Sequence, residues 1–573
     1  MTASVYQAPI FTNGYEHTQG TGYQLPEYPF ETPPELQGQP SPLYPVVVVG
    51  GGITGLTLAC ALAVHGVPVV MVDEDNTVGV KGASSRGICY TQKSLEILDR
   101  LGVFEPIARK GIEWHVGRTF AGHDEVFSFD LNQQNGFALS QQPSFINIQQ
   151  FYIEGYLVER LMALKQAGAP VDLRWSSRVV ACQPSAQHVG LRVQTPEGSY
   201  ALKAQWVVDA SGSHTPFHEW LGVSMKGERG DDRWCIADVK FKDTPPTERH
   251  TWIEAPFNDN RAVWQHLMGD EVWRIDYQME PDADPAEVSK ESVVRERLQR
   301  QFGHDVACDI VWVGPYAYRS VYLDRLQVGR VFFMGDTAKI VSPFGARGGN
   351  TGIADADNLA WKLAAIHHGR ANESLLASYH QERHQAAEQN IRVTRRTAHF
   401  LRPKAGMERV FRSATIELAK RLPFARTLIN TGRMAEANRY TQSSICGEGG
   451  GVSMPNAPLR WLNGRAGQWH DLQAWAQGRM VLLAFGPLNP AELTRLRALS
   501  TSADARVVQV VTQADQAQAV EAIADPKGLL RQAAHAQAAR WALIRPDSYV
   551  AATGQRLDGS LVRAMGQAMA FMG

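Results

Sequence analysis

The sequence predicts an α/β fold, α+β overall, in which a parallel sheet is interrupted by an antiparallel sheet and followed by a smaller α/β domain. Four consecutive valines, Val46–Val49, precede a glycine-rich turn, an apolar helical stretch and a second β-branched run, which is the pattern of a β-α-β unit. Residues 226–318 alternate between polar and apolar types, as in an antiparallel sheet with one buried face. A β-branched strand followed by a long helix returns at 329–369.

The chain divides at changes in composition. Residues 1–45 hold eight prolines, four glutamates and no Lys or Arg, so we expect an extended arm and no basic transit peptide. We expect this arm to be solvated; the less favoured alternative is that it packs along its own domain or a partner subunit. A Gly-, Ser- and Pro-rich stretch at 441–458 predicts a linker. The predicted domains are therefore a parallel core over 46–225 and 319–440 with its associated helices, an inserted sheet over 226–318, and a last domain over 459–573.

Composition excludes several classes of protein. The 573 residues are 44% hydrophobic and carry a formal charge of −1, so no global field attracts a polyanion, and we expect no nucleic-acid partner. Six cysteines without a C-x-x-C pair or a Cys/His cluster indicate free thiols in a reducing cytoplasm and no metal site. Without an apolar run of about eighteen residues or a signal peptide, we expect no membrane association.

Four tryptophans lie in the predicted antiparallel sheet, at positions 234, 252, 264 and 273. Large aromatic side chains on half-buried strands usually form the core of the sheet. They can also form the wall of an apolar substrate pocket. The sequence favours the core over the pocket.

The glycine-rich turn has the spacing Gly50-x-Gly52-x-x-Gly55 and is placed between a strand and a helix that starts around Ile53 and Thr54. In the Rossmann-like dinucleotide fingerprint, the first glycine permits the tight turn, the second lets a pyrophosphate approach, and the third lets helix and strand pack closely. The pyrophosphate would lie at the helix N-terminus. Asp73 ends the second strand, where a carboxylate would accept hydrogen bonds from a ribose.

A second element distinguishes the nucleotide. Gly335-Asp336 ends the strand RVFFM and precedes TAKIVSPFGARGGNTGIADADNLAWKLA. An acid at a strand end can hold a chain of hydroxyl groups. The following glycine-rich loop and helix start would offer unpaired N–H groups to a partly negative ring oxygen.

This second run resembles the G-D-A-A-H-x-x-x-P-x-x-G-x-G-x-N-x-G-x-x-D-A-x-N-L-x-W-K-L motif of class A flavoprotein monooxygenases, the aromatic hydroxylases of the p-hydroxybenzoate hydroxylase superfamily. The resemblance covers about residues 45–400 and implies FAD as the cofactor, with Asp336 binding its ribityl chain. The loop from Pro343 to Asn350 would lie along the reactive face of the isoalloxazine ring. The resemblance also implies FAD contacts from Gly335, Gly348, Gly349, Arg86 and Gln150.

The remaining motifs match the family in part. Asp209 begins a D-A-S-G variant of its middle motif, which is associated with FAD and NAD(P)H, but His218 stands where an arginine is expected. Lys339 replaces the common histidine of G-D-A-A-H. RPDSYVA, at 545–551, resembles the signature of the thioredoxin-like tail of phenol hydroxylase relatives. Without C-x-x-C that domain cannot be a dithiol catalyst, so its expected role is packing or subunit contact, as in a homodimer.

The resemblance implies a mechanism in which NADH or NADPH reduces FAD and the reduced flavin reacts with O2 to give a C4a-hydroperoxide that hydroxylates a small aromatic substrate, a phenol. The protein would orient the substrate and exclude water, with Pro343 in the loop beside the flavin. No motif identifies the group that deprotonates the phenol. Candidates in the inserted sheet are His266, Tyr277 and Arg274, and each can equally be a hydrogen-bonded sheet residue.

Three other functions stay open at this point. A flavin halogenase would carry W-x-W-x-I-P after the middle sheet, and this hexapeptide does not occur in the sequence. An FAD-dependent oxidase or reductase without ring hydroxylation is compatible with the altered middle motif. A flavin sensor without catalysis fits less well, because the loop on the pocket side is kept in full.

Overall fold

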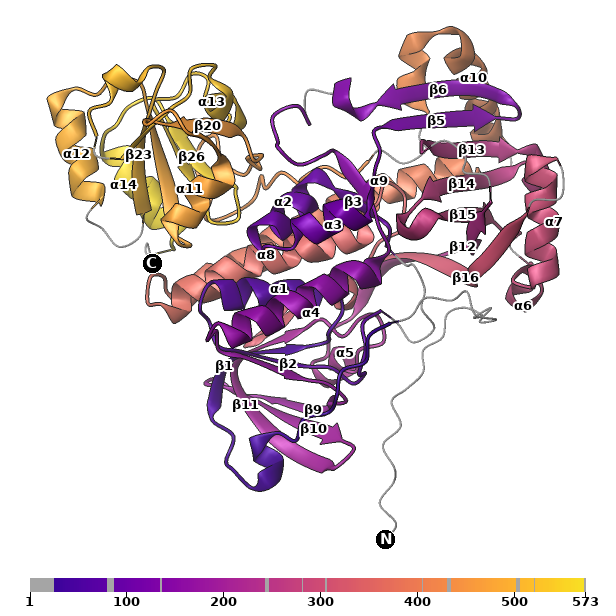
Figure 1. Ribbon diagram of the computed structural model, residues 1–573, viewed down its shortest axis with the longest axis horizontal. Coiled ribbons are helices and arrows are strands. Elements are labelled where there is room, and N and C mark those ends of the chain that lie inside the picture. Colours follow the sequence, from indigo (N-terminus) through magenta and orange to yellow (C-terminus); the bar gives the residue numbers. More distant parts are fainter. Residues whose placement is uncertain are drawn as a thin grey trace.

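A computed structural model describes residues 25–79, 87–133, 137–242, 247–280, 282–303, 307–403, 406–429, 434–500, 505–519 and 521–570. Figure 1 shows a parallel core at the centre and bottom, an antiparallel sheet at the right and the C-terminal domain at the upper left. Long helices cross the centre between them. The predicted mixed α/β architecture is confirmed.

The central sheet is built from the β-branched runs. Val46–Val49 are almost completely buried, because helices and neighbouring strands cover both faces of a parallel sheet. The first strand starts at Leu43, three residues before the predicted start of the core. The parallel strands, in the order β18-β11-β1-β2-β8, are β18 (Val331–Phe333), β11 (Gly198–Asp209), β1 (Leu43–Val49), β2 (Val69–Val72) and β8 (Val171–Arg174). Antiparallel strands β17 (Gln327–Val328), β10 (Val189–Thr195) and β9 (Arg178–Pro184) extend it.

Three helices form the layer above this sheet. α1 (Ile53–Val64) packs against α4 (Gln150–Gln166) and α8 (Gly348–His367). Residues 53–63 of α1 are all buried, so this helix has no polar face, as expected for the central helix of a layer. α2 (Gln92–Arg100) packs on α8, and α9 (Ala377–Leu401) follows α8 along the chain.

The antiparallel sheet is larger than the predicted segment. Its strand order is β19-β16-β12-β15-β14-β13-β5-β6, and the last two strands come from residues 116–130, outside 226–318. β5 pairs in parallel with β13, a contact between distant segments that local sequence patterns do not reveal. The strands are β5 (Val116–Ala121), β6 (Asp124–Asp130), β12 (Met225–Phe241), β13 (Arg249–Ala255), β14 (Arg261–Leu267), β15 (Val272–Gln278), β16 (Cys308–Leu323) and β19 (Lys339–Ile340).

The tryptophans of this sheet have mixed roles. Trp234 stacks on Trp264 with ring centroids 4.8 Å apart, and Trp252 and Trp273 belong to the cluster on the other face. These contacts agree with the predicted core role. Trp264 also lines the large cavity described below, so for this residue both interpretations hold.

The C-terminal domain has a seven-stranded sheet in the order β21-β20-β24-β23-β22-β25-β26. Its central strands β22, β23 and β24 are parallel, and β25 and β26 are antiparallel. The thioredoxin-like assignment stays a prediction. The elements are β20 (Pro458–Trp461), β21 (Ala466–Gln468), α11 (Trp469–Ala476), β22 (Met480–Phe485), α12 (Pro490–Ser500), β23 (Ala505–Val511), β24 (Ala522–Ala524), α13 (Leu529–Ala533), β25 (Trp541–Ile544), β26 (Val550–Gly554) and α14 (Gly559–Ala568).

The stretch 441–458, predicted as a linker, lies against this domain. Backbone hydrogen bonds join Gly447 and Gly451 to residues 550 and 551, and Met454 to Ser548. Asn456 is buried and its side chain donates to Gln142 and Gln468. The glycines permit these close backbone contacts, since a Cβ at Gly450 would stand 2.2 Å from the Ala551 carbonyl oxygen.

A buried group of charges, which we call the interdomain cluster, joins the C-terminal domain to α8 and α9. Its members are Lys362, Glu382, Arg545 and Asp547, and all four side chains are inaccessible to solvent. Arg545 donates to Glu382 at 2.5 Å and also pairs with Asp547, while Lys362 donates to Glu382 at 3.0 Å. Arg545 and Asp547 are the R and D of RPDSYVA, so this motif forms the contact between domains.

The described part of the N-terminal arm is packed, contrary to the expectation of a solvated arm. Arg174 donates to Glu35 at 2.9 Å, and both side chains are 3% exposed. Tyr28 stacks on Trp175 with ring centroids 4.5 Å apart. Residues 25–42 therefore form part of the core domain's surface layer.

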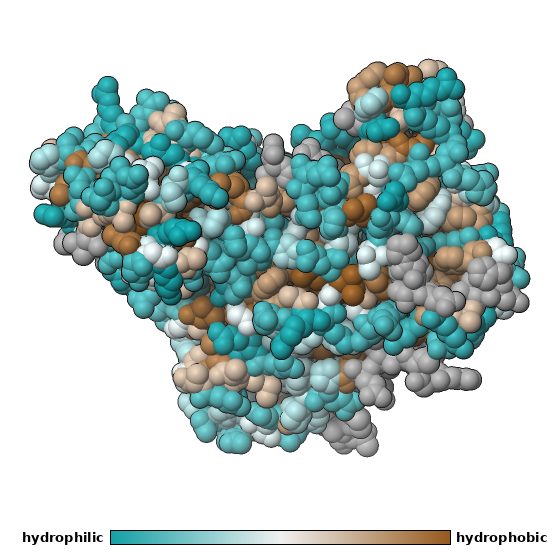
Figure 2. Space-filling view, turned by 45° about the horizontal axis from the view of Figure 1, so that its top comes forward, coloured by the Kyte–Doolittle hydropathy of each residue, from teal (hydrophilic) through white to brown (hydrophobic). Residues whose placement is uncertain are grey.

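Exposed apolar side chains gather on α10 (Met407–Arg421) and the turn after it. Met407 is 78% exposed and Phe424 67%. In Figure 2 apolar residues are visible at the upper right, where α10 lies. No helix in the described ranges is both long enough and apolar enough to span a membrane.

Candidate functional site

One cavity of about 460 Å³ connects the central sheet to the antiparallel sheet. The ends of β1, β2 and β11 and the start of α1 form one end of it, and strands of the antiparallel sheet form the other. The loop before α8 lies between them. The predicted site residues that line the cavity are Gly50, Gly52, Ile53, Thr54, Asp73, Gln150, His266, Arg274, Asp336, Pro343, Gly348, Gly349 and Asn350.

The three glycines of the fingerprint have different surroundings. Gly50 has φ +108°, and a Cβ there would stand 2.5 Å from the Ala210 carbonyl oxygen. Gly55 does not line the cavity, and its Cβ would stand 1.9 Å from the Gly50 oxygen, so it serves helix packing. At Gly52 the nearest atom to an added Cβ is Glu154 Oε1 at 3.9 Å. Gly52 therefore borders open space at the start of α1.

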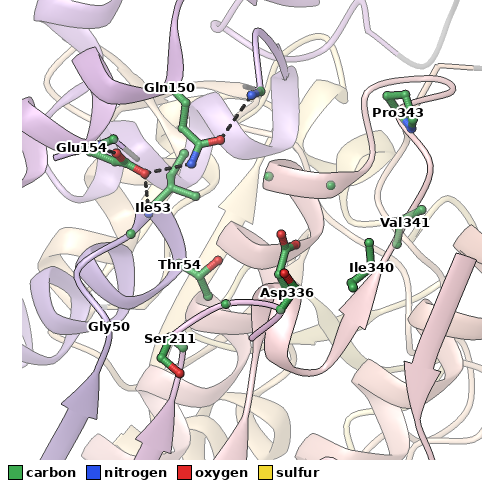
Figure 3. A pocket seen from close by; sticks show the side chains of 18 of the residues that line it. Gly50, Ile53, Thr54, Gln150, Glu154, Ser211, Asp336, Ile340, Val341 and Pro343 are labelled. Carbon is green, nitrogen blue, oxygen red and sulfur yellow. Dashed lines mark hydrogen bonds between the residues drawn. The ribbon is translucent and has the colours of Figure 1, made fainter. Parts of the chain in front are cut away.

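Glu154 is a site residue that the sequence analysis missed. Its carboxylate is buried and accepts hydrogen bonds from the Ile53 N–H at 2.9 Å, the Gly79 N–H at 2.6 Å and the Gln150 amide at 2.8 Å. Gln150 in turn accepts from the Gly87 N–H at 3.3 Å. Figure 3 shows these contacts beside the first residues of α1. The signal was present in QFYIE, since residues four apart share one face of a helix.

Asp73 lies directly after β2 and is held by backbone donors. It accepts from the Gly51 N–H at 2.5 Å and the Asp75 N–H at 2.7 Å. Burial raises the pKa of Asp73 to about 7, although these two donors lower it in part. The carboxyl group is thus fixed at the cavity wall beside the glycine turn, as the fingerprint predicts.

Asp336 projects into the cavity from the turn after β18. Its side chain is exposed, and Figure 3 shows the carboxylate pointing into the space between Thr54 and Ile340. Gly335 is buried behind it with φ +61°, and a Cβ there would stand 2.7 Å from Thr54 Oγ1. The glycine therefore lets this turn approach the start of α1.

Buried charges behind this turn explain Lys339. Lys339 is fully buried and pairs with Asp355, which also accepts from Arg383 at 2.6 Å and from the Gly335 N–H at 3.0 Å. Burial alone would raise the pKa of Asp355, but the two cations hold it below its usual value. A lysine in place of the family histidine thus belongs to the network that supports the Asp336 turn.

The loop and helix start at the middle of the cavity are rich in glycine. Pro343 lines the cavity, and its carbonyl oxygen accepts from the Ala346 N–H at 2.9 Å. At Gly348 an added Cβ would meet no atom within 4 Å, and at Gly349 the nearest atom belongs to Tyr90 at 3.8 Å. Asn350 ties α8 to the strand containing Cys89, because it donates to the Cys89 oxygen at 2.8 Å and accepts from the Thr91 N–H at 3.0 Å.

The middle motif forms a turn at the cavity wall. Asp209 is buried, does not line the cavity, and accepts from Ser211 Oγ at 2.6 Å and Thr215 Oγ1 at 2.7 Å. It therefore shapes the turn, whose residues 210–217 do line the cavity. His218 Nε2 lies 2.7 Å from the Thr337 carbonyl oxygen. This histidine thus contacts the residue next to Asp336.

The antiparallel sheet supplies polar groups to the far end of the cavity. Arg249, His266, Arg274 and Asp276 all line it and are all at most 6% exposed. Arg274 donates to Asp276 at 3.0 Å. Burial, and then the two arginines, lower the pKa of His266 well below its ordinary value, so this imidazole is neutral at neutral pH. Arg249 and Asp276 were not predicted, because a single charged residue in a strand gives no local signal.

Two predicted residues do not join the described site. Tyr277 is wrong as a candidate for phenol deprotonation, because its hydroxyl donates to Gln301 at 2.9 Å and its ring packs in the cluster on the opposite face of the sheet. Residues 274 and 276 face the cavity, and strand alternation turns residue 277 away. Arg86 lies outside the described residues.

The chemistry of the cavity fits FAD. Helices α1 and α8 both begin at its wall, and the first N–H groups of a helix favour negatively charged ligand groups. Asp73 and Asp336 offer carboxylates for hydroxyl groups at two separate places. Gly348 and Gly212 leave space that a Cβ would fill. A long nucleotide with two polar ends matches this arrangement.

Comparison with known proteins agrees with this assignment. Residues 43–394 match a family model described as FAD binding domain, and 465–567 match the HcaD C-terminal domain. The 3-(3-hydroxy-phenyl)propionate/3-hydroxycinnamic acid hydroxylase 2 of Burkholderia vietnamiensis is 26% identical over 88% of this chain and 93% of its own. The 6-methylpretetramide 4-monooxygenase of Streptomyces rimosus is 28% identical over 94% of each chain.

Among solved structures, the flavin-dependent monooxygenase PieE in complex with FAD and substrate superposes with a TM-score of 0.77 at 20% identity, over 93% of this chain and 100% of PieE. At this identity the similarity establishes the fold. The family model spans more than half of the chain, from β1 into α9, and includes both nucleotide-binding elements. The chain therefore belongs to the FAD binding domain family and is a class A flavoprotein monooxygenase of the aromatic hydroxylase type.

Proposed function

We propose that this enzyme hydroxylates a phenolic aromatic substrate, with NADH or NADPH as electron donor and O2 as co-substrate. The observation that carries the proposal is a continuous cavity that joins the nucleotide-binding turn of α1 to the aromatic and charged face of the antiparallel sheet. A ring bound against that sheet would lie close to the loop at Pro343, where the resemblance puts the flavin ring.

FAD, when bound, supplies the electron transfer and oxygen activation. The residues of this chain bind and orient. Asp336 would accept hydrogen bonds from ribityl hydroxyls, and the start of α8 would offer N–H groups to the partly negative edge of the ring system. Pro343 and Trp264 provide apolar wall that excludes water from the ring end.

A phenol bound at this end would meet cationic and neutral polar groups. His266 is neutral there and, because its pKa is lowered, it is a weak proton acceptor. Arg274 is paired with Asp276 and holds its proton at all relevant pH values. We therefore assign to Arg274 and His266 the positioning of the ring, and we assign proton removal to neither.

The names of the relatives support a phenolic substrate. One is a hydroxylase of 3-(3-hydroxy-phenyl)propionate and 3-hydroxycinnamic acid, and another is a monooxygenase of 6-methylpretetramide. A homodimer and a cytoplasmic location stay predictions, which light scattering and cell fractionation would test.

The experiment separates hydroxylation from the alternatives. The FAD-loaded protein is mixed with NADH or NADPH under nitrogen and flavin reduction is followed by absorbance. The reduced protein is then exposed to air with a panel of phenols, and products are analysed by mass spectrometry. Addition of one oxygen atom to a phenol supports the proposal. Turnover that gives only hydrogen peroxide indicates an oxidase, and incorporation of chloride or bromide indicates a halogenase.

A further inference from the structure

We infer that Arg249 recognises an anionic oxygen of the aromatic substrate, either a carboxylate or an ionised phenol. The inference rests on the proposed function, because it takes the ring to bind at the sheet end of the cavity. It makes Arg249 the residue that selects substrates by charge.

Arg249 is a buried cation without a carboxylate partner among the described residues. It lies on β13, is 6% exposed and lines the cavity. Its guanidinium donates to Met434 Sδ at 3.3 Å and lies 5.8 Å from the Trp264 ring centroid. Its Nε atom is buried without a hydrogen-bond partner in the described part of the chain. A thioether and an aromatic face are weak substitutes for an anion.

The other buried arginines show what is missing. Of the five others in the described ranges, four pair with carboxylates at 2.5–3.0 Å: Arg174 with Glu35, Arg274 with Asp276, Arg383 with Asp355 and Arg545 with Glu382. The fifth, Arg347, donates to the Asn390 amide oxygen at 2.7 Å. In this protein, a buried guanidinium is thus normally neutralised within the fold. Burial lowers the pKa of Arg249, which expresses the cost of keeping this charge away from water. An arginine nevertheless keeps its proton in a protein.

The groups that face Arg249 do not neutralise it. Asp276, on β15, is bonded to Arg274 at 3.0 Å. Burial raises the pKa of the Asp276 carboxyl group although both Arg274 and Arg249 lower it in part, so this one acid does not offset two arginines. His266, on β14, is neutral because its pKa is lowered well below its ordinary value. Burial raises the pKa of the Cys89 thiol to about 12, so it carries no charge near neutral pH. Among the described residues, none of these three groups therefore neutralises Arg249, and its guanidinium faces the cavity.

The chemistry of the guanidinium indicates the ligand. Its planar fork donates parallel hydrogen bonds to two oxygens of a carboxylate, or to a single phenolate oxygen with greater strength than to a neutral group. Trp264 beside it provides an aromatic surface for the ring that carries the anion. A carboxylate and a phenolate both present an anionic oxygen on an aromatic compound. The experiment below uses a separate probe for each of them.

The test measures binding to the FAD-loaded protein without turnover, by perturbation of flavin absorbance or fluorescence. Benzoate is compared with benzamide, its neutral isostere, and 4-nitrophenol is titrated at pH values where it is neutral or ionised. The proteins are wild type, Arg249→Met and Arg118→Met. Arg118 is the matched control, because it lies on the neighbouring strand β5, outside the cavity, and pairs with Glu248 and Glu125 at the surface.

Wild type should bind at least one anionic probe about ten- to hundredfold more tightly than its neutral counterpart. This ratio is the contribution to affinity expected of a charge-assisted hydrogen bond. Arg249→Met should lose this preference, and Arg118→Met should keep it. Preference for benzoate identifies a carboxylate, and preference for ionised 4-nitrophenol, with the absorbance of the bound phenolate, identifies a phenolate. Equal preference in wild type and Arg249→Met, or no preference in wild type, would overturn the inference.

The melting temperature of the ligand-free protein distinguishes substrate recognition from a structural role of Arg249, because loss of a structural contact would lower it. Removal of an unpaired buried charge should leave the melting temperature of the ligand-free protein unchanged or raise it. Arg249→Lys, which keeps the charge without the fork, should keep part of the preference. If Arg249→Met fails to fold or to hold FAD, the charge serves the fold and the inference is wrong. Failure of the proposed function is a separate result, since it appears as absence of phenol hydroxylation by wild type.

Discussion

Replacement of Asp336 by alanine tests the proposed ribityl contact. The carboxylate is exposed in the cavity, so the ligand-free fold should tolerate the change, with an effect on unfolding within about 0.5 kcal/mol. Hydrogen bonds to a charged group contribute about 1.5–3 kcal/mol, so the Kd for FAD should rise roughly ten- to hundredfold. Asp336→Asn keeps an acceptor oxygen without the charge and should have a smaller effect, because neutral hydrogen bonds contribute about 0.5–1.5 kcal/mol.

The assay has two parts, one with FAD and one without it. FAD is removed, and its rebinding to wild type and the two variants is titrated by fluorescence. Asp309→Ala is the control, since Asp309 is an exposed carboxylate on β16 that does not line the cavity. The melting temperatures of the FAD-free proteins should agree, and those of the FAD-loaded proteins should separate as binding weakens. Unchanged FAD affinity in Asp336→Ala would refute the assignment of this residue.

Three further predictions concern the glycine turn, the interdomain cluster and Asp73. Gly52→Val should give folded, colourless protein, because the added Cβ has only Glu154 Oε1 within 4 Å, at 3.9 Å, while the methyl groups of the valine reach the cavity. Gly55→Ala should misfold, because its Cβ would stand 1.9 Å from the Gly50 backbone oxygen. Copurification of FAD with Gly52→Val would contradict this. Arg545→Met leaves Glu382 without its main partner and should lower the free energy of unfolding, measured by urea denaturation, by about 3–5 kcal/mol. A change within experimental error would show that this ion pair does not stabilise the fold. Folding raises the pKa of Asp73 from 3.8 to about 7, so between these pH values the folded protein holds a proton that the unfolded chain has released. The free energy of unfolding without FAD should therefore fall as pH rises from about 4 to 7. Asp73→Asn should reduce this pH dependence in melting curves, and an unchanged dependence would argue against the raised pKa.

Local patterns predicted residues of the central sheet that the structure places at the cavity wall. Gly50, Gly52 and Asp336 were recognised because each belongs to a contiguous strand–turn element, in which backbone conformation is set by neighbours in sequence. Glu154 could have been found from its spacing to Gln150, but helical spacing alone does not tell which face meets a ligand.

The substrate end could not be predicted in the same way. Strand alternation shows that residues 274 and 276 share a face, but not which face borders the cavity, and Tyr277 was therefore assigned to the wrong side. Arg249 could be recognised only from its surroundings in the structure, because the lack of a carboxylate partner among the described residues is a tertiary property. The pairing of β5 with β13 likewise joins segments more than a hundred residues apart.

The interdomain cluster has a consequence for the order in which the enzyme is made. α8 begins at the cavity wall with Gly348 and carries Lys362 further along, where the cluster holds it through Glu382 and Arg545. Arg545 follows α8 in the sequence with the whole of α9 and α10 between them, so a ribosome finishes the nucleotide-binding segments long before it supplies this residue. A nascent chain that stops before the last strands should therefore leave the ribosome with α8 unanchored at one end. Acquisition of colour during translation should then follow the synthesis of Arg545 and not that of α8.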